Sequence, residues 1–537
     1  MPSPLLFGLF FAAVALSHLT LLRLPYFWDE GGYYIPAALD FYHRFTLVPE
    51  YTNSHPPLPN ILLGMLWHLT GYHILITRLT VCAFAAASLL AIFRLTQRLT
   101  SPAAALATTL LTAVYPIWFA QSTLAHADIF AAAFTLAAFA LYLPAQNLSS
   151  RPERSALERP LYLSFARGAA IATLFSLAAL SKETAIVEPA ILAAVHLTLL
   201  LLHRRNALLR RLHATWLATL STPLLPLLAW YTYHRHKTGA IFGNPIYLRY
   251  NATANFTAAH ILTSFYYRGI HLFWQRNIWL PILLALACLL LPQRPAGNLK
   301  PETCNLKPVF RAIALLILGN WLVFSVLGGA LLTRYLLPIY PLILLACVAT
   351  WRDRTRHWPW LAALTAAAFI SAIWLNPPTS FAPEDNLTYR DMIVVHQQAT
   401  AYIAQHYPDA QVLTAWPAAA ELFRPDLGYV TRSIKVTPLE NFTAAEINKA
   451  AQEPGKFDTA LIFTTHYTSP ALQRYLLQHP TTKRGREFAQ ERDLTPQEVA
   501  AILHGTVIVE YERNGETAAV LRFSRSYEAR NIPPLTR

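Results

Sequence analysis

Two adjacent carboxylates, Asp29 and Glu30, stand in the aromatic segment YFWDEGGYY at residues 26–34. The apolar run LLFGLFFAAVALSHLTLLRL comes just before them and is long enough to cross a bilayer. Neighbouring carboxylates repel each other unless cations or hydrogen-bond donors converge on them, so a simple helix end explains the pair poorly. A positioned carboxylate can accept a proton from a hydroxyl or an amine, which makes the pair a candidate for general base catalysis.

Further ionisable residues lie at the ends of other apolar segments. Lys, Arg and His can neutralise the charge of a departing phosphate. Charged groups at the centre of a membrane helix cost about 2.5–3.5 kcal/mol each on insertion scales, so charged groups in membrane proteins tend to face cavities or one another. The set comprises His55 in SHPPLPN, Asp128 in AHADIF, Lys182 and Glu183 in SKET, and Arg334 and Tyr335 in LTRYLLPIYP.

Each member of this set also has a purely structural interpretation. Arg334 could anchor a helix at the interface, and Lys182 could pair with its neighbour Glu183. Asp128 could cap the helix that follows it, and His55 before two prolines could be a turn residue. The residues gain weight as a site only if the fold brings them to one place.

The composition describes a polytopic α-helical membrane protein. The 537 residues are 54% hydrophobic and 13% charged, and the mean hydropathy is +0.32. Because about 17–25 apolar residues span a bilayer, we predict about eleven transmembrane helices. They lie near residues 4–24, 72–93, 102–120, 128–145, 165–180, 184–202, 213–232, 277–291, 310–328, 335–350 and 358–375.

The net charge of +14 comes from the membrane half of the chain. Residues 1–375 hold 27 Lys or Arg against 11 Asp or Glu, whereas residues 376–537 hold 16 against 18. The excess gathers in every second loop, which the positive-inside rule assigns to the cytoplasm, so it does not indicate nucleic acid binding. These loops carry Arg94 and Arg98; Arg151, Arg154, Arg159 and Arg167; Arg204, Arg205, Arg210 and Arg211; Arg294, Lys300, Lys307 and Arg311; and Arg352, Arg354 and Arg356.

This topology predicts a cytoplasmic N-terminus and an extracytoplasmic (periplasmic) C-terminal domain in the plasma (inner) membrane. The first apolar segment has no basic n-region and no clear cleavage site, so we expect a retained helix rather than a cleaved signal peptide. The four cysteines show no disulfide framework and no zinc pattern. All the candidate residues named above fall on the outer face, and we therefore expect them to form one site.

The chain divides into two predicted domains. Residues 1–375 form the membrane domain, with long aromatic outer loops at 25–57 and 233–276, and residues 376–537 form a soluble α/β domain. In the second domain, QVLTAW and DTALIFTT read as buried strands, and TVIVEYERNGETAAVLRF reads as a hairpin with an Asn514-Gly515 turn. This domain has no evident catalytic motif, so we expect it to act as a cap or to dock the acceptor.

The segments WDEGGYY, HPPLPNILLG, HADIF, SKET and RYLLPIYPLILL resemble, in order and sidedness, those of the GT-C fold glycosyltransferases. The resemblance is to the group that holds the protein O-mannosyltransferases and the lipid A aminoarabinose transferases. It covers residues 1–375, and the outer C-terminal domain is similar to that of the aminoarabinose transferases. Members of this group move a sugar, with inversion, from a polyprenyl-phosphate carrier to a hydroxyl of a protein or lipid outside the cytoplasm.

The resemblance implies a role for each candidate residue. Asp29 would be the general base or would position the acceptor, with Glu30 supporting it. Ser54-His55 is closer to the mannosyltransferase form, which speaks against aminoarabinose as the donor sugar. The donor phosphate would be bound by His55, Lys182, Arg334 and Tyr335, and the site would be organised by Asp128 and Glu183. The requirement for a divalent cation stays open, because Asp29, Glu30 and Asp128 could bind Mg²⁺ or Mn²⁺ or could work without it.

Two other classes of protein remain open from the sequence. A transporter or flippase of a lipid-linked or anionic solute would place charges at the membrane midplane and show an internal duplication, and neither is evident. The second class is a different lipid-carrier transferase, such as a phosphoethanolamine transferase or an oligosaccharide ligase. The first of these would need a metal cluster with a Thr nucleophile in residues 376–537, where we find no such set. The expected partners are therefore a polyprenyl-phosphate sugar, a protein or lipid acceptor and membrane lipids, and not nucleic acid.

Overall fold

The computed structural model describes residues 2–48, 55–148, 164–243, 256–294, 307–327, 329–377, 381–465, 470–482, 485–486, 488 and 491–523. Arg151, Arg154, Arg159, Lys300 and Cys304 of the predicted cytoplasmic loops lie outside these residues, as do parts of both predicted outer loops. The chain forms two compact units, which we call the helical unit (Met1–Leu22 and Pro36–Ile373) and the sheet unit (Arg23–Ile35 and Trp374–Arg537). The segment around Asp29 and Glu30, which we predicted as part of the membrane domain, thus groups with the C-terminal residues.

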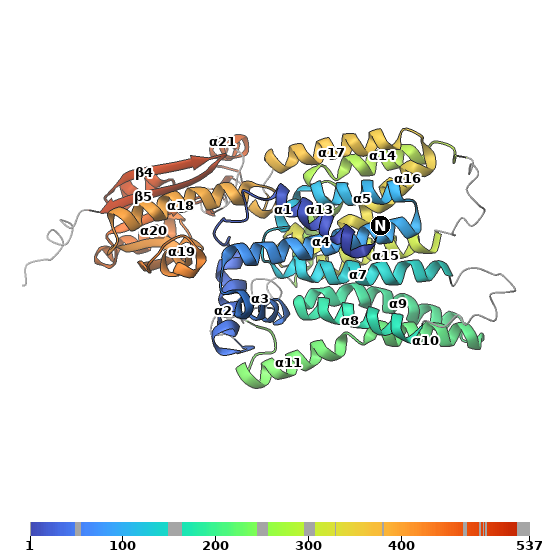
Figure 1. Cartoon of the computed structure of the whole chain (residues 1–537). Helices are drawn as coiled ribbons and strands as arrows, with labels where there is room; N and C mark the ends of the chain where they lie inside the picture. Colours follow the sequence, from blue (N-terminus) through green and yellow to red (C-terminus); the bar gives the residue numbers. More distant parts are fainter. Residues whose placement is uncertain are drawn as a thin grey trace, which may run out of the picture. The chain divides into compact units, whose positions relative to one another are not determined.

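The helical unit consists of packed α-helices and short 3₁₀ turns (Figure 1). Its helices are α1 (Ser3–Ser17), α2 (Ile35–Arg44), α3 (Leu58–Thr70), α4 (Ile74–Leu99), α5 (Pro102–Val114), α6 (Pro116–Gln121), α7 (Ala127–Leu148), α8 (Phe165–Ser181), α9 (Val187–Leu202), α10 (Ala207–Ser221), α11 (Leu224–Thr238), α13 (Ala258–Phe273), α14 (Trp279–Leu289), α15 (Lys307–Leu327), α16 (Tyr340–Arg354) and α17 (Trp358–Trp374), with 3₁₀ turns η3 (Glu183–Ile186), η5 (Gln275–Asn277) and η6 (Thr333–Leu336).

Each predicted transmembrane segment contains helix, but the described helices differ in length. Four of them are long and apolar enough to cross a membrane, and a fifth span is possible if one bent helix pair counts as one. Other apolar helices have 10–17 residues, among them Ser3–Ser17, Pro102–Val114 and Trp358–Trp374. The predicted count of about eleven spans therefore stays a prediction.

The bent pair adds a helix to the predicted outer loop at 233–276. Helix α13 lies within that range, and it meets α14 at an angle of 91°. The backbone breaks at Arg276 and Asn277, whose φ angles of 53° and 64° fall in the left-handed region that ends a right-handed helix. The predicted span at 277–291 is accordingly a short helix that follows a sharp turn.

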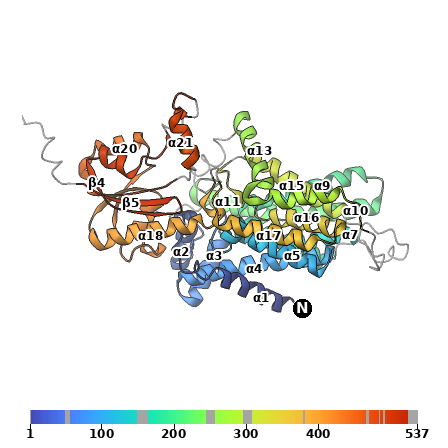
Figure 2. The same cartoon turned by 90° about the horizontal axis from the view of Figure 1, so that it is seen from above.

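The helices of the helical unit pack side by side. Helices α5, α7, α9 and α17 run along one common direction in both Figure 1 and Figure 2. Aromatic pairs join α7 to its neighbours: Phe84 of α4 lies 4.5 Å from Phe130 between ring centroids, and Phe139 lies 5.9 Å from Phe175 of α8. Because Phe130 and Phe139 are fully buried, α7 is a fixed central element of the unit.

The sheet unit holds a five-stranded sheet with helices packed on it. Its elements are the π-helical turn η1 (Glu30–Tyr34), η7 (Pro383–Asp385), α18 (Thr388–His406), β1 (Gln411–Ala415), α19 (Ala418–Phe423), η8 (Pro425–Leu427), β2 (Lys435–Leu439), α20 (Ala444–Ala451), η9 (Pro454–Lys456), β3 (Thr459–Phe463), α21 (Pro470–Gln478), α23 (Pro496–Ile502), β4 (Gly505–Arg513) and β5 (Glu516–Phe523). The strand order is β2-β1-β3-β5-β4, with β1 parallel to both β2 and β3 and with β5 antiparallel to β3 and β4.

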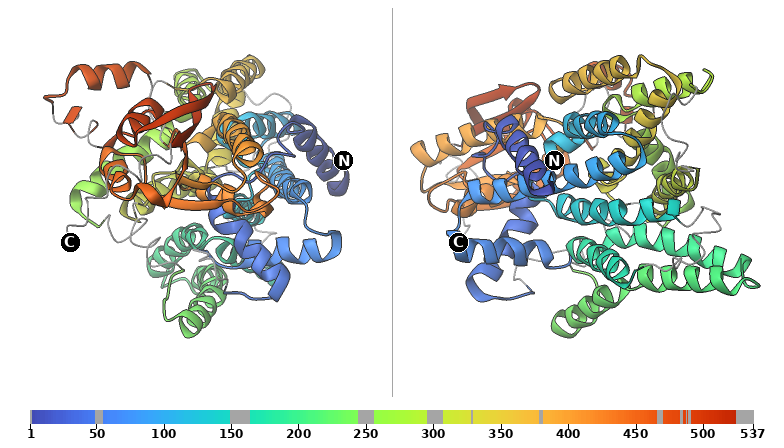
Figure 3. Two further views of the ribbon diagram at one scale, coloured as in Figure 1. Left: turned by 90° about the vertical axis from the view of Figure 1, so that its left-hand side faces the viewer. Right: turned by 45° about the vertical axis from the view of Figure 1, so that its right-hand side comes forward.

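The strands and the hairpin that we predicted in this unit are confirmed. β1 and β3 occupy QVLTAW and DTALIFTT, and every residue of β3 is buried, as suits a central strand. β4 and β5 form the hairpin (Figures 1 and 3), and its turn residues Asn514 and Gly515 both have positive φ angles, 50° and 88°. These angles are those of a type I′ turn, which explains the Asn-Gly sequence.

Candidate active site

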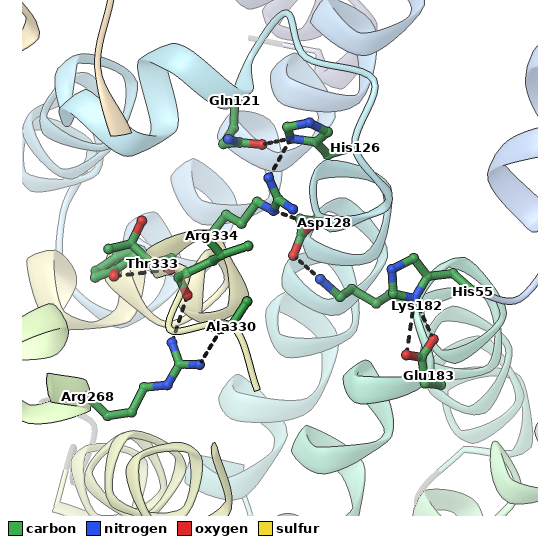
Figure 4. A network of polar contacts seen from close by, with 12 residues as sticks. His55, Gln121, His126, Asp128, Lys182, Glu183, Arg268, Ala330, Thr333 and Arg334 are labelled. Atoms are coloured by element: carbon green, nitrogen blue, oxygen red, sulfur yellow. Dashed lines mark hydrogen bonds and ion pairs between the residues drawn. The ribbon is translucent and has the colours of Figure 1, made fainter. Parts of the chain in front are cut away.

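A buried carboxylate, Asp128, is the centre of a charged cluster in the helical unit (Figure 4). It stands in the first turn of α7, where the partial positive charge of a helix N-terminus stabilises an anion. Lys182 Nζ donates a hydrogen bond to Asp128 Oδ1 at 2.5 Å, and Arg334 Nε lies 3.4 Å from Asp128 Oδ2. The three side chains are at most 5% exposed, so these charges interact in a medium of low polarity.

An interruption of the helix at Lys182 explains why this residue pairs with Asp128 rather than with its neighbour Glu183. Helix α8 ends at Ser181, and Lys182 is extended, with φ −149° and ψ 123°, before η3 begins at Glu183. The two side chains therefore point in different directions (Figure 4). Glu183 instead accepts from His55 Nδ1, at 2.9 Å for Oε2 and 3.1 Å for Oε1.

Arg334 and Tyr335 come from the 3₁₀ turn η6. Lys182 Nζ lies 3.9 Å from the centroid of the Tyr335 ring, a cation–π contact. The phenol of Tyr340 donates to Thr333 O at 3.2 Å, which fixes the start of the turn. The turn thus brings a guanidinium and an aromatic face to the same lysine.

Arg268 of α13, which the sequence did not single out, holds the loop before η6. Its side chain is fully buried, and it donates from Nη1 to Leu332 O at 2.7 Å and from Nη2 to Ala330 O at 3.3 Å (Figure 4). Its guanidinium also lies 5.4 Å from the centroid of Tyr335. Its sequence signal is a basic residue inside FYYRGIHLF, an apolar helical pattern within what we predicted as a loop.

His126 and Arg78, which the sequence also did not single out, both shape the loop before α7. Gln121 Oε1 can only accept, so His126 Nδ1 donates to it at 2.9 Å. Burial, with Arg334 and Lys182 nearby, holds the pKa of His126 well below its usual value, so the ring is neutral. Arg78 Nη1 donates to Thr123 O at 2.6 Å.

A small cavity adjoins the cluster. It has a volume of about 20 Å³ and is lined by Asp128, Lys182, Glu188, Arg334 and Tyr335, among others. That volume suffices for one water molecule and not for a phosphate group.

Asp29 and Glu30, the candidate catalytic carboxylates, belong to the sheet unit. Glu30 is 0% exposed, and its Oε2 accepts a hydrogen bond from Phe27 N at 2.8 Å. Burial, and to a lesser degree the charge of Asp29, raise the pKa of Tyr33. The structure thus brings Asp128, Lys182, Glu183, His55, Arg334 and Tyr335 together within the helical unit, whereas the approach of Asp29 and Glu30 to them stays a prediction.

A divalent cation bound by Asp29, Glu30 and Asp128 would take ligands from both units, so this site stays a prediction. Among the described residues, no three His, Cys, Asp or Glu side chains gather so that they could hold a metal ion. We therefore derive no catalytic step through a metal.

Comparisons with known proteins place the chain among membrane glycosyltransferases. A model of the Alg9-like mannosyltransferase family matches residues 10–420, more than half of the sequence. A comparison with curated protein sequences finds no significant match.

Among solved structures, apo ArnT from Cupriavidus metallidurans aligns with a TM-score of 0.50 at 14% identity over 96% of this chain and 97% of that one. The undecaprenyl phosphate complex of ArnT from the same organism gives 0.49 at 15% identity, covering 96% and 98%. An oligosaccharyltransferase from Archaeoglobus fulgidus, in complex with Zn and sulfate, gives 0.46 at 12% identity, covering 96% and 72%. At these identities, the likeness to apo ArnT shows a shared fold.

Proposed function

The chain belongs to the Alg9-like mannosyltransferase family of GT-C glycosyltransferases, which makes it an integral membrane enzyme, and we propose that it transfers a sugar from a polyprenyl-phosphate carrier to a hydroxyl group of a protein or lipid. The proposed reaction takes place on the outer face of the plasma (inner) membrane, with the N-terminus in the cytoplasm. The basic loops and the outer position of the candidate residues in the predicted topology support this orientation.

The observation that carries the proposal is the pair of buried cations on Asp128. Lys182 and Arg334 come from different parts of the chain, and both meet the same carboxylate. Such groups are costly to bury, so a structure retains them where their charge is used. A leaving phosphate gains negative charge during sugar transfer, and fixed cations stabilise that charge in the transition state.

The mechanism we propose is a single displacement with inversion. The acceptor hydroxyl oxygen forms a bond to the anomeric carbon while the bond from that carbon to the phosphate oxygen breaks. The hydroxyl proton passes to the carboxylate of Asp29, and the bonding electrons leave with the polyprenyl phosphate. Lys182, Arg334 and His55 bind the leaving phosphate, and Asp128 and Glu183 hold these basic side chains in place.

The donor sugar is proposed to be mannose or a related hexose. The family membership supports this choice, and so does Ser54-His55, which is closer to the form found in protein O-mannosyltransferases. A pentose such as aminoarabinose is the competing donor. The acceptor is a protein or lipid hydroxyl that reaches the site from the aqueous side.

The proposal is tested by incubating the purified protein, in lipid nanodiscs, with a panel of polyprenyl-phosphate sugars and acceptors. Mass spectrometry follows loss of the donor and release of the polyprenyl phosphate. We expect mannose-type donors to be consumed, and we expect Asp29→Asn to lower turnover about 10²-fold, as the loss of a general base does. Parallel reactions with EDTA, Mg²⁺ or Mn²⁺ decide whether a divalent cation takes part.

The control variant is Arg94→Gln, which removes a cation on the predicted cytoplasmic side that bonds to Gln97 and Ser3. It should retain full activity. Consumption of no lipid-linked sugar by a folded sample would refute the proposed donor class. Near-normal turnover of Asp29→Asn would remove Asp29 as the base and leave the donor class standing.

A further inference from the structure

The segment Arg23–Ile35, which carries Asp29 and Glu30, folds as part of the sheet unit although some 340 residues of the helical unit separate it in sequence from Trp374. We call it the carboxylate segment. If the sheet unit consisted only of C-terminal residues, this segment would group with the helices that flank it in sequence. Specific contacts must therefore hold the segment in the sheet unit.

Two hydrogen bonds to the backbone of Tyr26 fasten the start of the segment. Tyr26 N donates to Leu427 O at 3.1 Å, and the phenol of Tyr429 donates to Tyr26 O at 3.2 Å. Tyr26 itself is only 1% exposed. Both backbone groups of Tyr26 are thus satisfied by Leu427 and Tyr429 of the sheet unit, which lie far away in sequence.

Aromatic contacts fasten its middle. Trp28 meets Trp416 edge to face with ring centroids 4.8 Å apart, and Phe27 lies 5.8 Å from Tyr389 of α18. Trp28 has a φ of 41°, a left-handed conformation that a residue with a bulky side chain adopts only where its surroundings impose it. The packing against Trp416 therefore holds a backbone shape that the segment would not keep alone.

The two glycines after the carboxylates let the segment approach this closely. A methyl group at Gly32 would lie 2.8 Å from Trp416 Cζ2 and 3.1 Å from its Nε1, and a methyl group at Gly31 would lie 3.2 Å from Leu427 Cδ1. Distances under 3.0 Å require an atom to move. The indole ring of Trp416 thus occupies the space that any side chain at position 32 would need.

We propose that the sheet unit is a structural part of the active site, because Trp416 and Leu427 hold the carboxylate segment in the conformation that presents Asp29. Trp416 is a positioning residue in this proposal, since it acts on the reaction through Asp29. The proposal rests on the proposed role of Asp29 as the base. It gives the sheet unit a task in the chemical step in addition to any contact with the acceptor.

The test combines Gly32→Ala, Trp416→Leu and the double variant in the full-length protein. Leucine ends at its Cδ atoms, so it has no counterpart of the indole atoms that a methyl group at Gly32 would meet. Hydrogen exchange by mass spectrometry reports on residues 24–35, and kinetics give kcat and the donor KM. Gly8→Ala is the matched control for the glycine, because a methyl group at Gly8 has no neighbour within 4 Å. Phe457→Leu, at another buried aromatic residue of the sheet unit, is the control for the ring.

We expect both single variants to raise exchange of the segment at least tenfold, since local opening becomes easier, and to lower kcat with little change in donor KM. In the Trp416→Leu background, Gly32→Ala should cause no further fall in kcat and no further rise in exchange, so the effects of the two substitutions should be non-additive. The control variants should exchange in residues 24–35 like the wild type.

Two results would overturn the proposal. One is exchange of residues 24–35 in Trp416→Leu at the wild-type rate, and the other is an equal loss of kcat from Gly32→Ala in the wild type and in Trp416→Leu. Asp29→Asn, measured alongside, separates this failure from failure of the proposed function. If Asp29→Asn stays active while the exchange data behave as expected, the anchoring of the segment stands and Asp29 is not the base. If Asp29→Asn is inactive while exchange never changes, the base stands and the anchoring falls.

Discussion

Arg268→Met tests whether the loop that carries Arg334 must be held from behind. The substitution removes two hydrogen bonds from a charged donor, to Leu332 O at 2.7 Å and to Ala330 O at 3.3 Å. A hydrogen bond of this kind contributes about 1.5–3 kcal/mol, and the longer bond counts for less, so the loop loses about 3 kcal/mol. A factor of ten corresponds to about 1.4 kcal/mol, and we therefore expect kcat/KM for the donor to fall about 10²-fold.

The assay measures initial rates over a range of donor concentrations, together with direct binding of a polyprenyl phosphate. Arg268→Lys keeps the charge and can make one of the two bonds, so it should recover about tenfold of the loss. Arg311→Met on α15 is the control, since Arg311 is exposed and the same substitution there should leave donor use unchanged. Full donor affinity in a folded Arg268→Met sample would refute the reasoning, because the turn η6 would then keep its shape without the guanidinium.

Three further predictions concern other ionisable side chains. Lys182→Met removes one of the two cations on Asp128 and leaves Arg334 as its partner, so it should destabilise the fold by less than the about 3–5 kcal/mol of an uncompensated buried charge and should lower turnover about 10²-fold; near-normal turnover in a folded sample would contradict a role for the cation. Glu183→Gln removes the negative charge that His55 contacts and should lower donor affinity about tenfold, with Glu183→Asp intermediate; unchanged binding would show that the pair is only structural. Burial and a neighbouring carboxylate raise the pKa of Glu516 to about 8, so the folded chain binds a proton between pH 4.5 and 8 that the unfolded chain lacks. Stability should fall through this window as pH rises, by about 1.4 kcal/mol per pH unit, and Glu516→Gln should flatten the thermal melting profile; an unchanged slope would contradict the raised pKa.

The sequence predicted the members of the charged cluster because sidedness alone sorts them. Asp128, Lys182 and Arg334 all lie at helix ends that the basic loops assign to one face, and the structure gathers them. The sequence could not predict that Lys182 pairs with Asp128 rather than with Glu183. This pairing depends on helix α8 ending at Ser181, one residue before Lys182. Arg268 was missed because its α13 lies in a range too interrupted to read as a membrane helix.

The strands of the sheet unit were predictable for a different reason. Apolar runs bounded by turn residues predict strands from the local sequence alone. The Asn514-Gly515 turn likewise sets the pairing of the two strands beside it, β4 and β5. The capture of the carboxylate segment by this unit was not predictable, because it depends on contacts between residues some 390 positions apart, such as Trp28 with Trp416. Two consecutive glycines indicated a close approach of the backbone, but nothing in the sequence named the partner.

The acidic pair at Asp29 and Glu30 illustrates how neighbouring residues can divide two tasks. Glu30 turns its carboxylate back to Phe27 N and has no exposed surface, so its charge is used in closing a backbone turn. Because Glu30 already has a backbone hydrogen-bond donor, the adjacent carboxylates need not both act as bases to explain why they lie side by side. It also ties Asp29 between two anchored neighbours, Trp28 on one side and Glu30 on the other. The chemistry proposed for Asp29 therefore depends on a turn that its neighbour closes and on a tryptophan ring supplied by the far end of the chain.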